Sequence, residues 1–210
     1  SISVVQNQIK NYKNFELITT KKNGGALNSV LTGVEHASPN DEDVIVVLDG
    51  DDWLAKRNVL SALNEVYSNN DCLITYGSYI EYPAGVRGKF SKQVPEHIVK
   101  NKLFRQSEWM TSHMRTCKYK LWKNVKRSDI VHENGNVYRM AGDLPVVFPM
   151  LEMAEERSYF IEDIIYVYNR INPLNEDKVN HGLQLSIDAE VRAKPKYKRL
   201  EDEILLRGSK

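Results

Sequence analysis

One short run of residues, Val44 to Leu48, constrains the fold of this chain more than any other feature. All five of its residues are apolar and four of them are β-branched. A short, continuous apolar run of this kind is typical of a strand that is covered on both faces in a parallel sheet. Amphipathic helices are predicted on either side of it, from Leu27 to Ala37 and from Val59 to Tyr67. This alternation predicts an α/β domain.

Other helices and strands are predicted along the rest of the chain. Apolar residues recur at helical spacing in four segments: Ile2 to Tyr12, Met114 to Lys123, Leu144 to Glu155, and from about Leu183 onward. Strand-like runs extend over three: Phe15 to Thr20, Cys72 to Tyr82 and Tyr159 to Tyr168. The periodicity fades between Pro83 and Gln106, where Gly, Pro and Lys accumulate, so we expect an extended loop there. A chain of 210 residues fits one domain, which we divide into a core over residues 1–170 and a C-terminal helical appendage over residues 171–210.

Composition and charge exclude several classes of protein. The chain is 41% hydrophobic and 27% charged with a formal net charge of +1, which is ordinary for a globular protein and argues against a disordered or nucleic-acid-coating chain. No apolar run approaches the roughly 20 residues that span a membrane. The cysteines, Cys72 and Cys117, lie far apart, which indicates neither a zinc site nor a disulfide framework. A reducing compartment, the cytoplasm, fits this cysteine usage best.

Three carboxylates, Asp49, Asp51 and Asp52, directly follow the run that ends at Leu48. In open α/β sheets, ligands bind outside the carboxyl ends of the strands. Like charges this close repel one another unless a cation is nearby. These carboxylates offer only oxygen ligands, and too few of them to fill the coordination shell of a metal ion. Such a set suits Mg²⁺ or Mn²⁺ that substrate phosphates help to hold. The alternative is a solvated turn in which one Asp caps the following helix.

The motifs around this cluster follow an order that resembles the central signature of family 2 glycosyltransferases: the turn Asn23-Gly-Gly-Ala-Leu-Asn28, an amphipathic helix, and then Val44-Ile-Val-Val-Leu-Asp-Gly-Asp-Asp-Trp53. The resemblance implies a GT-A fold, an α/β arrangement in which helices flank a mixed, mainly parallel, Rossmann-like sheet. It also implies transfer of a sugar, with inversion, from a nucleoside diphosphate sugar to a hydroxyl acceptor, and a UDP-sugar is the expected donor. By this resemblance Asp49 faces the ribose or diphosphate of the nucleotide. Asp51 and Asp52 hold Mn²⁺ or Mg²⁺, so that the three carboxylates together form the metal site.

The turn before the first central helix carries four candidate donor-binding residues, Asn23, Gly24, Gly25 and Asn28. Glycines leave backbone amides unobstructed at a helix start, a geometry that favours a phosphate. The alternative is an ordinary turn between two elements. Asn28 matches the asparagine that the family places near the donor pocket. Leu27 stands where the family usually has an arginine, which argues against diphosphate contacts from this helix.

Inverting transfer needs a base that takes the proton from the acceptor hydroxyl. The segment Met140-Ala-Gly-Asp143, followed by an apolar helix, resembles the family segment in which an acidic residue precedes a helix at the acceptor face. Asp143 is therefore the candidate catalytic base. An Asp before Leu144 and Pro145 is also a typical helix N-cap, and the two roles are compatible. Glu152, deeper in the same helix, is the reserve candidate.

Candidate acceptor-side residues are Trp109, His113 and Arg115. In their mixed polar and aromatic stretch, a sugar could stack on a ring or a diphosphate could pair with a guanidinium. A lone histidine is more often a structural side chain, and this alternative stays open for His113. The segment from Tyr166 to Asn172 could flank the same cleft, but alternating tyrosines are equally typical of a half-buried strand.

Family members normally begin with strands and an Asp-rich turn that grips the nucleotide base, and no counterpart precedes Ser1. We therefore expect the first strands of the domain to be missing and the chain on its own to be weakly active. Two further classes stay open, a nucleotidyltransferase and a non-catalytic GT-A-like binding module. The expected partners are a nucleotide-sugar and a hydroxyl acceptor on a glycan, lipid or protein, with no nucleic acid and no transmembrane segment. A homo-oligomer or a neighbouring domain is compatible with the sequence.

Overall fold

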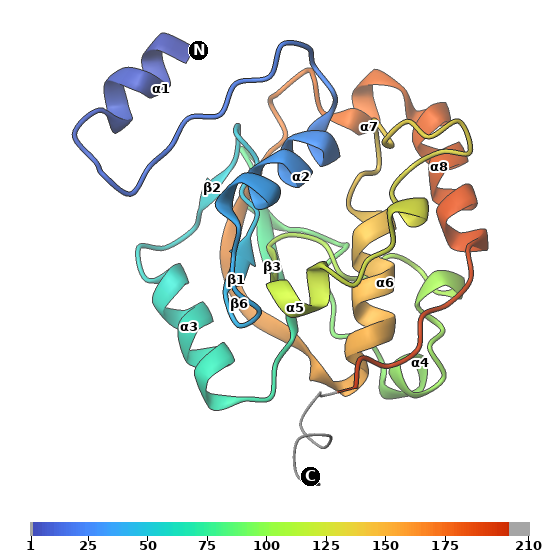
Figure 1. The fold of residues 1–210 in the computed structure, drawn as a ribbon. Coiled ribbons are helices and arrows are strands. Elements are labelled where there is room, and N and C mark those ends of the chain that lie inside the picture. Colours follow the sequence, from blue (N-terminus) through green and yellow to red (C-terminus); the bar gives the residue numbers. More distant parts are fainter. Residues whose placement is uncertain (1, 202–210) are drawn as a thin grey trace, which may run out of the picture.

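The computed structural model describes residues 2–201 of the chain, except for the side chains of residues 176 and 177. It shows a mixed six-stranded sheet flanked by helices (Figure 1), which confirms the α/β prediction. The strands are β1 (Val44–Val46), β2 (Trp53–Leu54), β3 (Ile74–Tyr82), β4 (Val86–Arg87), β5 (Arg115–Lys118) and β6 (Ser158–Asn169). Along the sheet their order is β1-β5-β3-β6-β2, and β4 pairs with β3.

Most neighbouring strands run antiparallel. Among the strands described, β3 and β6 are the one parallel pair, so parallel pairing is less common than the resemblance implies. The reason lies in β5, which inserts between β1 and β3 and runs antiparallel to both. The predicted helix from Met114 to Lys123 is wrong over Arg115–Lys118, which form this strand, and only the short helix α5 (Tyr119–Trp122) follows it.

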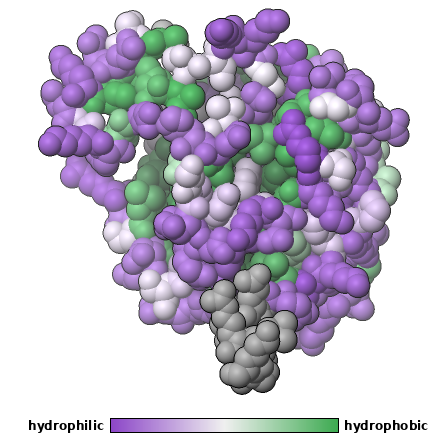
Figure 2. Space-filling view, viewed as in Figure 1, coloured by the Kyte–Doolittle hydropathy of each residue, from purple (hydrophilic) through white to green (hydrophobic). Residues whose placement is uncertain are grey.

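Helices surround the sheet and one of them stands apart. They are α1 (Ile2–Ile9), α2 (Ala26–Ala37), α3 (Val59–Asn69), α4 (Glu96–Lys100), α5, α6 (Leu144–Ala154), α7 (Glu176–Val179) and α8 (His181–Ala193), with 3₁₀ helices η1 (Phe104–Gln106), η2 (Arg127–Asp129) and η3 (Glu155–Arg157). α1 lies away from the rest of the domain, and none of its residues is buried. Apolar side chains gather over it in Figure 2, where Ile2, Val4 and Val5 are exposed.

Two hydrophobic cores cover the two faces of the sheet. Successive side chains of a strand point to opposite faces. On β3, Ile74 and Tyr76 therefore join the larger core, whereas Tyr79 joins a smaller one with Val59 and Leu63 of α3. The larger core also contains residues of α2, α5, α6 and α8. The sheet thus lies between two helical layers.

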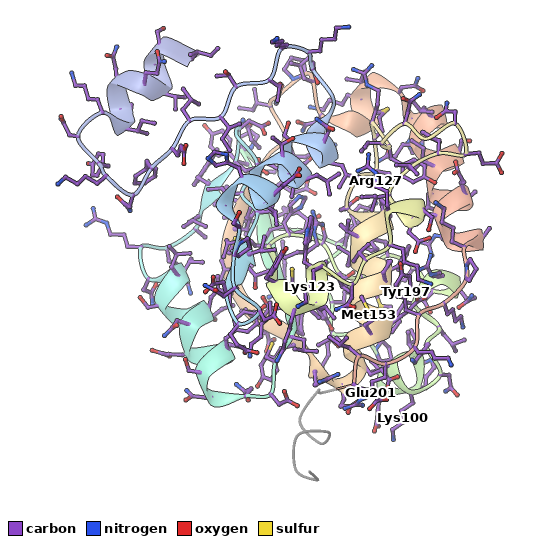
Figure 3. All side chains as sticks on the ribbon, viewed as in Figure 1. Lys100, Lys123, Arg127, Met153, Tyr197 and Glu201 are labelled. Carbon is purple, nitrogen blue, oxygen red and sulfur yellow. The ribbon has the colours of Figure 1, made fainter. Side chains whose placement is uncertain are left out.

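The helix α6 is the centre of the larger core, since every residue from Leu144 to Ala154 is buried. A helix that is apolar all round is covered on all sides. α8 packs against it and buries Ile187 and Val191. The segment after α8 also runs beside it (Figure 3), and there the Leu200 backbone N–H donates to the Met153 carbonyl at 2.9 Å. The predicted C-terminal appendage therefore packs on the core up to residue 201, and its last residues, 202–210, lie outside the described part of the chain.

Two predicted strands differ from the structure. The segment from Phe15 to Thr20 forms no regular element, and Phe15 and Ile18 are exposed because no described strand pairs with them. β1 forms within the predicted run, but it ends at Val46, runs antiparallel to β5 and is not covered on both faces. It lies at an edge of the described sheet and pairs only with β5, and Val46 is exposed.

The segment between Pro83 and Gln106 contains more structure than an extended loop. It forms β4, α4 and η1 and buries Ile98 and Phe104. Elements this short show no measurable periodicity, which explains why the sequence does not predict them. Within residues 2–201, no helix combines the length and the apolar character that crossing a bilayer requires.

Candidate active site

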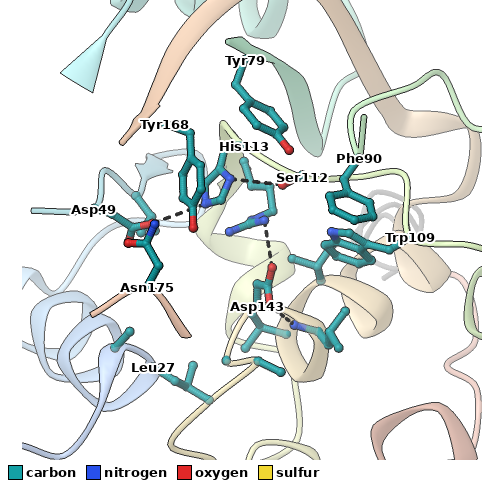
Figure 4. Close-up of a pocket in the computed structure, with 18 of the residues that line it drawn as sticks. Leu27, Asp49, Tyr79, Phe90, Trp109, Ser112, His113, Asp143, Tyr168 and Asn175 are labelled. Atoms are coloured by element: carbon teal, nitrogen blue, oxygen red, sulfur yellow. Dashed lines mark hydrogen bonds and ion pairs between the residues drawn. The ribbon is translucent and has the colours of Figure 1, made fainter. Parts of the chain in front are cut away.

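A pocket of about 1160 Å³ brings together groups from distant parts of the chain. Its wall includes Asp49 and Asp51, which follow β1, together with Arg115 of β5 and Asp143 before α6. Figure 4 shows Asp49 and Asp143 approaching the pocket from different sides. Carboxylates therefore face the same cavity from two elements that the sequence separates widely.

The acidic turn after β1 is tied to the end of β6. The Tyr166 hydroxyl donates to Asp52 Oδ2 at 2.6 Å, and the Asn169 backbone N–H donates to Asp52 Oδ1 at 2.8 Å. The side-chain amide of Asn172 donates to Asp51 Oδ2 at 2.5 Å. Both oxygens of Asp52 thus already accept a hydrogen bond, and Asp51 is held at one oxygen on the pocket wall.

His113 connects this turn to the aromatic side of the pocket. Its Nε2 lies 3.4 Å from Asp49 Oδ2, and its Nδ1 lies 3.1 Å from Ser112 Oγ. The imidazole stacks on the rings of Tyr166 and Tyr168, with centroid separations of 4.9 and 5.3 Å. Contacts at both ring nitrogens and on the ring faces fix the direction of Nε2 toward Asp49.

The surroundings shift the acidities of this group in opposite directions. The hydrogen bond from His113 lowers the pKa of Asp49, whereas burial raises the pKa of Asp52. Burial next to the two carboxylates also raises the pKa of the Tyr166 hydroxyl. Tyr166 therefore stays a hydrogen-bond donor to Asp52 throughout the physiological range.

Three side chains are close enough to share a metal ion. One ligand atom each from Asp49, Asp52 and His113 lies within 4.8 Å of the other two. Carboxylate oxygens suit Mg²⁺ and Mn²⁺, and an imidazole nitrogen favours a transition metal. Asp51, which the sequence places in the same site, lies outside this group of three and faces the pocket beside it.

Asp143 combines a structural contact with a position on the pocket wall. Asp143 is the N-cap residue of α6, and its Oδ1 accepts a hydrogen bond at 3.0 Å from the backbone N–H of Leu144, the first residue of that helix. Its Oδ2 pairs with Arg115 Nη1, also at 3.0 Å. One carboxylate oxygen therefore orients the side chain, and the other meets a guanidinium inside the pocket.

Trp109, an acceptor-side candidate, lies in the pocket, whereas Glu152, the reserve candidate for the base, lies in the core. Trp109 lines the pocket and packs edge-on against Phe148, with ring centroids 5.4 Å apart. Glu152 is fully buried, where Arg105 pairs with its carboxylate at 2.7 and 3.0 Å. Glu152 does not line the pocket, so its burial and its ion pair argue for a structural role.

The glycine turn before α2 lies beside the pocket rather than in its wall. Asn23 Oδ1 accepts a hydrogen bond from the Gly25 backbone N–H at 2.9 Å, and Gly25 has a φ of +89°. A Cβ built at Gly24 would meet the Asn28 side-chain nitrogen at 2.6 Å. At this end of α2, Leu27 lines the pocket, whereas these four candidates do not.

Several pocket residues escape prediction from the sequence. Tyr79, Phe90 and Ser112 line the cavity, as do Gln184 and Asp188 of α8. Ser112 precedes His113 directly, and this adjacency is the one signal that could have revealed it. The α8 residues belong to the predicted appendage, whose amphipathic pattern carries no sign of a pocket.

Comparison with known proteins adds a family to this geometry. The family model described as glycosyl transferase family 2 matches residues 1–125. A search of curated proteins found no match. The matched segment contains the acidic turn, His113 and Arg115, and it ends before Asp143.

Proposed function

This chain belongs to glycosyl transferase family 2, and we propose that it transfers a sugar from a UDP-sugar to an acceptor hydroxyl. The observation that carries the proposal is that Asp49, Asp51 and Asp143 line one pocket of about 1160 Å³. Pockets for small molecules and cofactors typically measure about 300–1,000 Å³, so this one has room for a nucleotide sugar and part of an acceptor. Carboxylates for a metal ion, and a separate carboxylate for proton removal, are the groups that such a transfer needs.

The donor diphosphate is proposed to bind beside the acidic turn together with Mn²⁺ or Mg²⁺. Asp49, Asp51 and Asp52 are the proposed carboxylate ligands. His113 is added to them because its Nε2 lies 3.4 Å from Asp49 Oδ2. The single imidazole nitrogen favours Mn²⁺ over the harder Mg²⁺. When bound, the ion would neutralise charge on the departing diphosphate.

Asp143 is the proposed catalytic base. The Leu144 N–H holds one of its oxygens at 3.0 Å, which orients the other toward the pocket. In the proposed reaction Asp143 takes the proton from the acceptor hydroxyl while the hydroxyl oxygen bonds to the anomeric carbon. The bond from that carbon to the diphosphate oxygen breaks, and its electron pair leaves with UDP. Attack on the side opposite to the leaving group inverts the anomeric centre, and Trp109 offers an aromatic surface for the acceptor.

The test is release of UDP from a panel of UDP-sugars, measured with Mn²⁺, with Mg²⁺ and with a chelator. Release should require the ion and should fall at least about 100-fold in Asp49→Asn, as expected when a group that stabilises developing charge is removed. Asp163→Asn is the matched control, because this carboxylate is exposed and pairs with Lys56 at 3.2 Å. The control should behave as the wild type does.

Other outcomes separate the alternatives. UDP release that persists in the chelator and in Asp49→Asn contradicts the proposal. Transfer of the nucleotidyl group, seen by product analysis, indicates a nucleotidyltransferase. UDP binding without any turnover across sugars and acceptors indicates a binding module.

A further inference from the structure

Arg115 shares the pocket with both carboxylate groups and pairs with one of them, Asp143. It lines the cavity, and its side chain is 17% exposed. Its Nη1 donates to Asp143 Oδ2 at 3.0 Å, and within residues 2–201 Asp143 is the one hydrogen-bond partner of its side chain. A guanidinium carries five N–H donors in a planar fork. Arg115 therefore keeps unused donors at the pocket wall while it holds Asp143.

The charge of Arg115 also acts on the acidic turn. After the hydrogen bond from His113, the positive charge of Arg115 helps to lower the pKa of Asp49. Arg115 also lines the same cavity as Asp49 and Asp143, so a ligand that binds in this cavity between the two carboxylates is in a position to meet its guanidinium. A diphosphate beside Asp49 would present paired anionic oxygens, which a guanidinium binds in a bidentate geometry that it also uses for carboxylates.

We propose that Arg115 exchanges partners when the donor binds: it pairs with Asp143 in the empty pocket and with the diphosphate in the donor complex. The inference rests on the proposed function and adds a positioning residue to it. Loss of this contact frees Asp143 Oδ2, which Arg115 Nη1 holds at 3.0 Å in the empty pocket, to face the acceptor hydroxyl. Proton removal from the acceptor is thereby coupled to occupancy of the donor site.

This exchange has a consequence that a merely structural ion pair lacks. If Asp143 and the diphosphate compete for Arg115, each weakens the binding of the other to it, because coupling between two binding events is reciprocal. Removing the charge of Asp143 should therefore strengthen UDP binding, although it removes the proposed base. Asp143→Asn suits this purpose because the asparagine carbonyl can still accept the Leu144 N–H and cap α6.

The experiment is calorimetric titration of UDP in the presence of Mn²⁺ into wild type, Asp143→Asn, Arg115→Met and the double variant. We expect Asp143→Asn to bind UDP about 3- to 10-fold more tightly and Arg115→Met to bind it about 10-fold more weakly, as expected for a charge-assisted contact. The double variant should bind UDP with the same affinity as Arg115→Met, since without the guanidinium Asp143 and the diphosphate have no shared partner. Arg115→Lys keeps the charge without the fork and should bind UDP with intermediate affinity.

Lys89→Met is the matched control for loss of a positive charge. Lys89 also lines the pocket, but its Nζ lies over the Phe90 ring at 4.8 Å. In the Lys89→Met background, Asp143→Asn should still tighten UDP binding by the same factor. Thermal unfolding of each variant checks that it folds.

The outcomes distinguish this inference from the proposed function. If wild type binds UDP but Asp143→Asn does not bind it more tightly, the exchange of partners is refuted and the proposed donor site is not. The exchange is also refuted if Asp143→Asn tightens UDP binding by the same factor in the wild type and in the Arg115→Met background. That result would mean that Asp143 merely repels the anion. If neither wild type nor Asp143→Asn binds UDP with Mn²⁺, both the inference and the UDP-sugar donor are refuted.

Discussion

Replacing Tyr166 with phenylalanine should loosen the acidic turn while leaving the ring that supports His113. The hydroxyl that is lost donates to Asp52 Oδ2 at 2.6 Å, and the ring centroids of Tyr166 and His113 are 4.9 Å apart. A hydrogen bond to a charged group contributes about 1.5–3 kcal/mol. Asp52 is only partly buried and keeps its bond from Asn169 N–H. We therefore expect a loss near the lower end, about 1–2 kcal/mol, in the free energy of unfolding.

The same change should weaken Mn²⁺-dependent binding of UDP, because a turn that is no longer fixed must be ordered at the moment of binding. If the whole loss appears in binding, about 1–2 kcal/mol corresponds to about 5- to 30-fold in Kd. Urea denaturation measures the first quantity and calorimetric titration the second. The control is Tyr159→Phe, on the same strand, where the side chain is exposed.

Two results would refute this reasoning about Tyr166. Equal unfolding free energies for the two phenylalanine variants would show that the hydroxyl does not stabilise the turn. A stability loss in Tyr166→Phe without any change in UDP binding would show that the turn is not part of the donor site.

Two further predictions concern stability. Glu152→Gln should lower the free energy of unfolding by about 3–5 kcal/mol, measured by urea denaturation, because it leaves the charge of Arg105 unpaired in the core. Both side chains are at most 1% exposed there. A loss below about 1 kcal/mol would contradict the structural role of this pair. Gly25→Ala should lower the free energy of unfolding by about 1–2 kcal/mol, because Gly25 has a φ of +89° and its new Cβ would lie 3.1 Å from the Arg139 carbonyl oxygen. Gly33 lies inside the helix α2 that follows, and the Cβ of Gly33→Ala meets nothing within 4 Å, so this change should raise the free energy of unfolding by about 0.5–1 kcal/mol. Tm shifts of the same sign in the two variants would contradict this contrast.

The sequence predicts those parts of the fold that depend on neighbouring residues. The helices α2, α3 and α6 are predicted within a few residues, because their apolar spacing is a local property. β5 is not predicted, because Arg115–Lys118 become a strand only by pairing with β1 and β3 on either side. Such pairing depends on tertiary contacts, which override a helical spacing that these residues also satisfy.

The same distinction applies to the candidate site. The residues Asp49 and Asp143 stand out in the sequence because each occupies a recognisable local position, at a strand end or before a helix. The sequence places His113 among the acceptor-side candidates but does not predict its position beside the acidic turn, since its orientation depends on Ser112 and on stacking against rings of β6. A lone histidine in a sequence carries no information about such distant partners. Its contact with Asp49 therefore emerges only from the structure.

The end of β6 and the residues directly after it orient the acidic turn more than β1 does. β1 carries the turn at its end, yet the hydrogen bonds that orient Asp51 and Asp52 come from Tyr166, Asn169 and Asn172. The family match ends at residue 125, so the carboxylates lie inside the matched segment and the donors that orient them lie outside it. Substitutions between residues 166 and 172 should therefore change metal and UDP binding even when every carboxylate is intact, and the Tyr166→Phe titration measures this dependence directly.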